Sequence, residues 1–89
     1  MRTYTATVRY FRPEQAAGLT VVDVPADVAA ELGGLKQLKV TAMVNGQPFD
    51  SNTMPAGGGT LALSLNKQIL QAVGAAVGDE VSVAIERRG

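Results

Sequence analysis

Alternating apolar and polar residues predict six strands along the chain. In the first strand Tyr4, Ala6 and Val8 share one face and threonines share the other, which is typical of a half-buried strand. In the last strand Val81 and Val83 face inward in the same way. The expected strands cover residues 3–11, 19–24, 38–44, 47–51, 60–65 and 80–86.

Two short helices are expected between these strands, over residues 26–32 and 67–73. Pro25 suits the start of the first helix, Asn66 is a natural N-cap for the second, and a glycine follows each. About two turns of helix are not stable alone, so each helix must lie on a sheet. The residues that mark the buried helical faces are Val28 with Leu32 and Ile69 with Val73.

Three connections carry turn signals. Asn45-Gly46 predicts a type I′ hairpin, because both central residues of that turn need positive φ. Residues 13–18 are expected to turn, since Pro13 has no backbone N–H and Gly18 permits unusual dihedral angles. Residues 52–59 are expected to form a loop between strands.

The strand–helix–strand pattern occurs twice, 41 residues apart. At this offset Pro25 aligns with Asn66, and the apolar and glycine positions that follow also align. A duplication predicts a pseudo-twofold axis, and six strands with two helices then favour a small closed barrel, which leaves no free sheet edge. The alternative is two unrelated units whose apolar positions match by chance.

Composition narrows the classes of protein and of site. The 89 residues allow one domain, 1–89, and with two Tyr and two Phe the core must consist of Val, Leu, Ala and Ile. The absence of Cys excludes disulfides, thiolate metal sites and cysteine nucleophiles. The absence of His removes the commonest metal ligand and general base. We therefore expect no catalytic residues, no metal and no cofactor.

Charge gives no strong indication of a nucleic-acid or membrane partner. Eight basic and eight acidic residues cancel. Neither a signal peptide nor a long apolar run is visible, so a cytoplasmic protein is expected. If the first and last strands are neighbours, five arginines form a basic patch; scattered pairing with Glu14 and Glu86 is the favoured alternative. These arginines are Arg2, Arg9, Arg12, Arg87 and Arg88.

Two features are candidates for ligand binding. The backbone N–H groups of Gly57, Gly58 and Gly59 could cradle an anion, but a strand follows where a phosphate-binding loop needs a helix. A plain inter-strand loop is therefore favoured. Lys67 could bind an anion at the start of the second helix, although a solvated lysine is the simpler interpretation.

Several motifs together resemble one known family. They are Asn45-Gly46 with Phe49, Pro55 with the three glycines, Leu65-Asn66-Lys67, and Gly78-Asp79 with Val81. In order and spacing they resemble the domain-of-unknown-function family numbered nineteen hundred and five, from Tyr4 to Glu86. The resemblance implies a double-split β-barrel, related in fold to AbrB- and MazE-like regulators and completed within one chain. It implies no activity, substrate or catalytic residue, because the family has none assigned.

These observations favour a non-enzymatic binding or interaction module with a small ligand or a protein as its partner. A nucleic-acid-binding regulator is the alternative, suggested by fold analogy. An enzyme that uses carboxylates alone is a third hypothesis, which needs two carboxylates to meet in the folded chain.

Overall fold

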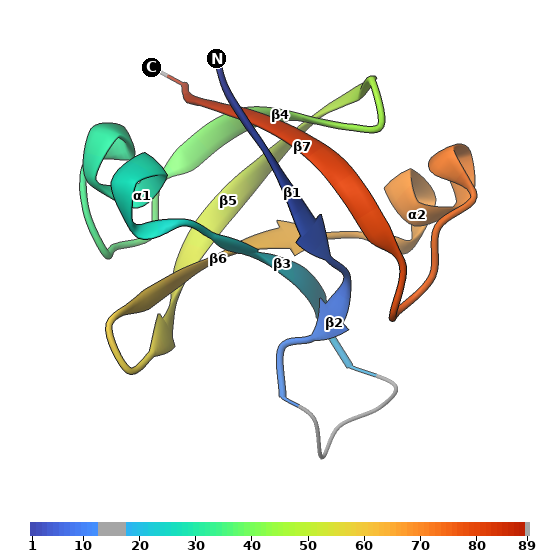
Figure 1. Ribbon diagram of the computed structural model, residues 1–89, viewed down its shortest axis with the longest axis horizontal. Coiled ribbons are helices and arrows are strands. Elements are labelled where there is room, and N and C mark those ends of the chain that lie inside the picture. Colours follow the sequence, from blue (N-terminus) through green and yellow to red (C-terminus); the bar gives the residue numbers. More distant parts are fainter. Residues whose placement is uncertain (13–17, 89) are drawn as a thin grey trace.

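The computed structural model describes residues 1–12 and 18–88, and in them seven strands and two helices (Figure 1). In chain order the elements are β1 (Arg2–Thr7), β2 (Arg9–Tyr10), β3 (Thr20–Val24), α1 (Ala26–Leu32), β4 (Lys39–Val44), β5 (Gln47–Gly57), β6 (Thr60–Leu65), α2 (Lys67–Val73) and β7 (Glu80–Arg87).

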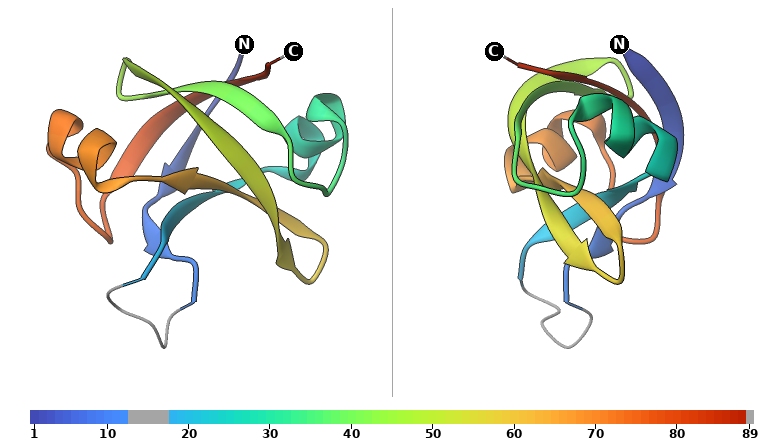
Figure 2. Two further views of the ribbon diagram at one scale, coloured as in Figure 1. Left: turned by 180° about the vertical axis from the view of Figure 1, so that it is seen from behind. Right: turned by 90° about the vertical axis from the view of Figure 1, so that its left-hand side faces the viewer.

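The strands form one antiparallel sheet in the order β1-β7-β4-β5-β6-β3-β2. The sheet curves into a half-barrel, and α1 and α2 lie at its two ends (Figures 1 and 2). The longest strand, β5, pairs with β4 up to Asn52 and with β6 from Thr53 onward. It thereby carries the sheet from one side of the half-barrel to the other.

The expected closed six-stranded barrel is wrong in both strand number and closure. The predicted first strand is interrupted at Val8. This residue belongs to neither β1 nor β2, and its backbone forms hydrogen bonds with the turn before β7. The Val8 N–H donates to the Asp79 carbonyl at 2.9 Å, and the Gly78 N–H donates to the Val8 carbonyl at 2.8 Å. Because of this interruption β1 pairs with β7 and β2 pairs with β3, so the two ends of the sheet are joined by the chain and not by a ladder.

The expected loop over residues 52–59 is also wrong for most of its length. Thr53, Met54 and Pro55 pair with β6, so the strand continues to Gly57. A bulge between Pro55 and Gly57 interrupts this ladder where the proline has no N–H to donate. The connection that remains is a tight turn at Gly58-Gly59. The turn predicted over residues 13–18 lies outside the described residues except for Gly18.

The helices and the first hairpin turn are confirmed. Both helices have the predicted bounds. The Asn66 Oδ1 accepts a hydrogen bond from the Ile69 N–H at 2.7 Å, as expected of an N-cap. Pro25 also stands at the N-cap position, without a side-chain hydrogen bond. In the hairpin turn Asn45 and Gly46 have φ of 49° and 85°.

The core consists of Val, Leu, Ala and Ile, as composition predicts. Alternate residues of β4, β6 and β7 are fully buried, and Tyr4 and Phe49 pack against its edge. The polar side chain of Thr53 is buried as well. Its hydroxyl accepts from the Leu38 N–H at 3.1 Å and donates to the Lys36 carbonyl at 3.0 Å, which satisfies both backbone groups.

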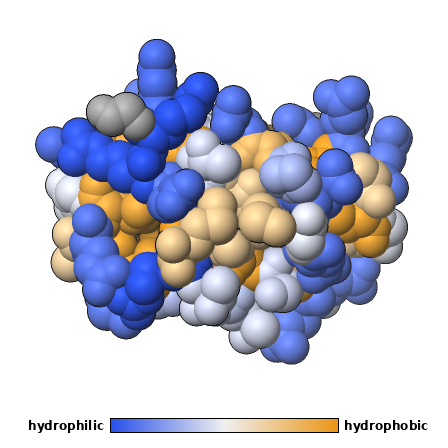
Figure 3. All heavy atoms as spheres, turned by 90° about the horizontal axis from the view of Figure 1, so that it is seen from above, coloured by the Kyte–Doolittle hydropathy of each residue, from blue (hydrophilic) through white to orange (hydrophobic). Residues whose placement is uncertain are grey.

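The outer face of β1, β7, β4 and β5 carries small side chains together with the charged residues Glu80, Glu86, Lys39 and Asp50. Its centre is weakly hydrophobic, with hydrophilic residues around it (Figure 3). One row of paired residues crosses this face: Thr3, Ala84, Met43 and Pro48. On β4 and β7 the residues on either side of these positions are buried in the core, as the period of two in a strand requires.

The two strand–helix–strand units occupy the same positions 41 residues apart. Helix α1 begins at Ala26 and α2 at Lys67, and Val28 and Ile69 are both buried beneath them. Residues at this offset also face each other across the sheet, Val22 with Leu63 and Met43 with Ala84. A pseudo-twofold axis would produce this arrangement, and the duplication itself stays a prediction.

Candidate ligand-binding groove

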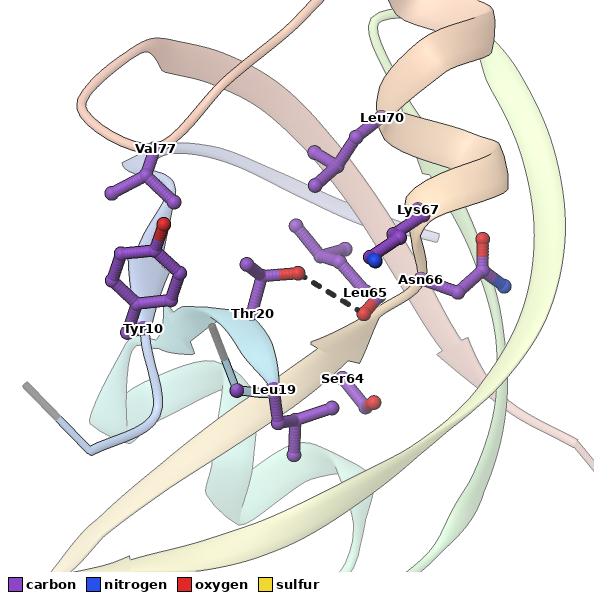
Figure 4. Close-up of a pocket in the computed structure, with 10 residues that line it drawn as sticks. Tyr10, Leu19, Thr20, Ser64, Leu65, Asn66, Lys67, Leu70 and Val77 are labelled. Atoms are coloured by element: carbon purple, nitrogen blue, oxygen red, sulfur yellow. Dashed lines mark hydrogen bonds between the residues drawn. The ribbon is translucent and has the colours of Figure 1, made fainter. Parts of the chain in front are cut away.

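A groove of about 680 Å³ lies between the first turn of α2 and strands β2 and β3 (Figure 4). Its lining comes from β2, β3, the end of β6, α2 and the segment before β7. The lining residues are Tyr10, Gly18, Leu19, Thr20, Ser64, Leu65, Asn66, Lys67, Leu70 and Val77. Its size falls in the range of small-molecule sites.

The walls of the groove are apolar. Tyr10 and Val77 form one side, Leu70 faces them from α2, and Leu65 lies between (Figure 4). Leu19 and Val77 remain 43% and 40% exposed. Large apolar side chains gathered at an exposed hollow are typical of a surface that binds something.

Local structure explains how these side chains come together. The N-cap at Asn66 ends β6 and starts α2, so that Lys67 and Leu70, three residues apart, lie on one helical face. Ile69 points instead into the core and fixes the rotation of the helix. Beneath them, Thr20 pairs with both Tyr10 and Leu65, and its hydroxyl donates to the Leu65 carbonyl at 3.2 Å.

Lys67 gives the groove its charge. Among the described residues that line the groove, it alone is charged, and its ammonium group points inward toward Thr20 and Leu65 (Figure 4). It forms no ion pair within residues 1–12 and 18–88. The Asp79 carboxylate, in the turn before β7, accepts from the Ala76 N–H at 2.9 Å.

The structure does not bring the predicted candidates together. Gly57, Gly58 and Gly59 form the turn before β6, whereas Lys67 follows β6 at its other end (Figure 1). All three glycines have positive φ, and an added Cβ would meet no atom within 4 Å. The Thr60 hydroxyl donates to the Gly57 carbonyl at 2.8 Å and closes this turn. Only Lys67 belongs to the groove.

Sequence reasoning missed the apolar part of the groove. The sequence pattern places Tyr10 and Leu19 in strands and Val77 in a connection, and it does not indicate a binding site at any of them. The available signal was the position of Leu19 and Val77, which are large apolar residues beside glycines at the ends of elements. Their convergence depends on the pairing of β2 with β3 and of β3 with β6, which local patterns do not reveal.

The five arginines do not form one basic patch. Arg9 and Arg12 lie at or beside β2, whereas Arg87 ends β7 and Arg88 follows it. The described carboxylates neutralise several of them: Arg2 pairs with Asp27 at 2.8 Å and with Glu31, Arg9 with Asp23 at 2.7 Å, and Arg88 with Asp50 at 3.5 Å.

Glu14 and Glu86 were the two carboxylates expected to pair with these arginines. Glu14 lies outside the described residues. The Glu86 carboxylate lies 3.9 Å from the N-terminal amine and forms no ion pair with a described arginine. No cluster of carboxylates suited to a metal ion occurs in the described residues. None of the described helices is long and apolar enough to cross a membrane.

The fold and the groove define a small, mostly β domain with two short capping helices and one open apolar hollow that contains a lysine. The chain belongs to the family described as "Domain of unknown function (DUF1905)", which it matches over residues 4–85. The resemblance seen in its motifs is thereby confirmed, whereas the fold relation to AbrB- and MazE-like regulators stays a prediction. No curated protein matches the chain.

Proposed function

We propose that the protein is a non-enzymatic binding module that holds a small apolar ligand in the groove between α2 and β3. The observation that carries this proposal is the exposure of Leu19 and Val77 on either side of a hollow floored by Leu65. Covering such side chains with a ligand removes apolar area from water, at about 25 cal/mol per Å².

The opposite end of the half-barrel supports the proposal as an internal comparison. Helix α1 has the same length as α2 and the same place in its unit. Yet the residues 41 positions before Lys67, Leu70 and Val77 are Ala26, Ala29 and Lys36. At these three positions the α1 end folds without large apolar side chains, so the fold as such does not require them at the α2 end.

The groove chemistry favours binding over catalysis. Lys67 and the Tyr10 hydroxyl are the titratable groups among its described lining residues, and no carboxylate stands beside either to act as a base. Leu19, Leu65, Leu70 and Val77 give the groove an aliphatic surface. Such a surface can hold and orient a molecule, but it lacks the paired acid and base that the carboxylate-only hypothesis requires.

The test is an amide-resolved NMR titration of the whole chain with a neutral apolar probe, octanamide. We expect shifts at Leu19, Thr20 and Leu70, and none at the turn of residues 57–59. Leu70→Asp should abolish them, whereas Leu35→Asp should not, because Leu35 is equally apolar but exposed before β4, outside the groove. No saturable shifts, or shifts spread over the whole surface, would overturn the proposal.

A further inference from the structure

The position of Lys67 bears on which ligand the groove accepts. Its side chain is exposed, and its ammonium group points over the hollow toward Thr20 and Leu65 (Figure 4). Lysine side chains ordinarily keep the charged group in water. An ammonium held over apolar side chains is well placed to meet a charge on a bound molecule.

The surrounding charges favour an anion. The described lining contains no acidic residue, so an anionic group entering the groove meets no like charge. Four carboxylates elsewhere, Asp23, Asp27, Glu31 and Asp50, are already paired with arginines. Asp79 is held by the Ala76 N–H in its own turn. Within the described residues Lys67 has no ion-pair partner, so its charge is available to a bound molecule.

The number of donors points to a single negative charge. A phosphate is usually recognised by several charged donors or by the bidentate fork of an arginine. Here one ammonium is available, with the Thr20 hydroxyl already donating to the Leu65 carbonyl. One ammonium and an apolar hollow match one carboxylate attached to an apolar group.

We propose that the ligand is an apolar monocarboxylate, with its carboxylate paired to Lys67 and its hydrocarbon part against Tyr10, Leu19, Leu70 and Val77. This inference rests on the proposed function of the groove. It adds the class of ligand and gives Lys67 the role of selecting a carboxylate over a neutral molecule of the same size.

The experiment compares octanoate with octanamide, which differ in charge but share the same chain. Calorimetric titrations at pH 7 with the whole protein should give octanoate an affinity at least about tenfold higher, equivalent to about 1.4 kcal/mol. Lys67→Gln should lower the octanoate affinity to that of octanamide and leave octanamide unchanged. Lys67→Arg should keep the preference. Lys39→Gln, which removes a charge on β4 outside the groove, is the matched control.

The outcomes separate the two proposals. The carboxylate assignment is overturned if octanamide binds and octanoate binds no more tightly, or if Lys67→Gln still prefers octanoate to octanamide. In either case the proposal that the groove binds an apolar ligand remains. If neither probe binds to a folded protein, the proposed function fails and this inference fails with it. Because Lys67 is exposed, we expect Lys67→Gln to fold, which its NMR spectrum without ligand verifies.

Discussion

Gly46 shows how a single residue determines a connection in this protein. It follows Asn45 in the turn between β4 and β5 with φ of 85°, and an added Cβ would meet no atom within 4 Å. A substitution there tests backbone strain alone. Gly46→Val should lower the free energy of unfolding by about 1–3 kcal/mol, measured by urea denaturation.

The control for this prediction is Gly46→Asn, because asparagine tolerates positive φ far better than valine. Gly46→Asn should lower the free energy of unfolding by clearly less than Gly46→Val does. Equal losses in both variants would show that something other than backbone conformation governs the turn.

The side chain of Tyr4 contains a polar group that lowers the stability of the folded protein. Its hydroxyl is buried without a hydrogen-bond partner in the described structure, and this burial raises the pKa of Tyr4 above its ordinary value. An unpartnered buried hydroxyl is unfavourable by about 1–3 kcal/mol. Tyr4→Phe should therefore leave stability unchanged or increase it by up to about that amount, measured by urea denaturation.

The matched control for Tyr4→Phe is Tyr10→Phe, at a tyrosine in the groove whose hydroxyl is not an unpartnered buried group. It should not stabilise the protein. A clear loss of stability in Tyr4→Phe would mean that the hydroxyl has a partner, such as an ordered water.

Single residues were predictable from the sequence where chemistry is local. The N-cap at Asn66 and the turn at Asn45-Gly46 follow from neighbours in the chain, and so does the choice of Lys67 as a candidate. Val8 was not predictable in this way. Its side chain fits an unbroken strand, and only its hydrogen bonds to the turn at Gly78-Asp79 divide that strand.

At the scale of elements, β1 is tied to α1 by charge. Arg2 donates to the Asp27 carboxylate at 2.8 Å and also pairs with Glu31. The hydrogen bond from Arg2 is the main reason that the pKa of Asp27 is lowered from its ordinary value. Since Asp27 also lies in the first turn of α1, the helix dipole favours its charged form.

This contact predicts a pH dependence of stability. A carboxyl group whose pKa is lower in the folded state stabilises the protein above its unfolded pKa, about 3.9 for Asp. That stabilisation is lost as the pH falls through the lowered folded value. Arg2→Met should therefore melt below the wild type at pH 7, and the gap in Tm should close as the pH falls from about 5 to about 2.

The control for Arg2→Met is Arg12→Met, because Arg12 lies over the Phe11 ring and forms no ion pair in the described residues. Its difference from the wild type should not vary over the same acid range. A gap for Arg2→Met that stays constant with pH would contradict the assignment to Asp27.

Element bounds were more predictable than element pairing. The helices are fixed by caps and glycines close to them in the chain, and both were predicted correctly. The length of β5 was not, because its second half contains Pro55 and glycine, which read as a loop until β6 pairs with it. For the same reason the groove, which needs β2, β3 and β6 side by side, was beyond prediction.

At the scale of the molecule, the charges are dispersed in a way that disfavours duplex DNA. The net charge is zero, and Arg2, Arg9 and Arg88 face carboxylates. A DNA-binding surface needs several uncompensated cations on one face. We expect affinity no tighter than the ~10⁻⁴ to 10⁻⁶ M of non-specific contact, measured by fluorescence anisotropy with random duplex at two salt concentrations.

Submicromolar binding that weakens steeply with salt would contradict this prediction and restore the nucleic-acid alternative. Arg87→Gln with Arg88→Gln should then reduce the salt dependence, whereas in the expected case it leaves the weak binding almost unchanged.

The closeness of the two chain ends has a consequence for connectivity. The N-terminal amine lies 3.9 Å from the Glu86 carboxylate, and the turn at Gly58-Gly59 is exposed (Figure 1). A circular permutant with a short linker between the ends and new termini in that turn keeps every ladder. Its order becomes β6-α2-β7-β1-β2 followed by β3-α1-β4-β5.

Each half of the permutant reads strand, helix, strand and then a segment that pairs with both halves of the sheet, which is β1 with β2 in one half and β5 in the other. The match extends to hydrogen bonds: the Val8 N–H donates to the Asp79 carbonyl and the Thr53 N–H to the Leu38 carbonyl, both at 2.9 Å. A second cut before β3 would divide the permutant into two fragments of similar topology. Strands of one fragment pair with strands of the other in the sheet. When the two fragments are co-expressed, they should reassemble as a split protein. The groove should form only in the reassembled protein, because α2 and β3 come from different fragments.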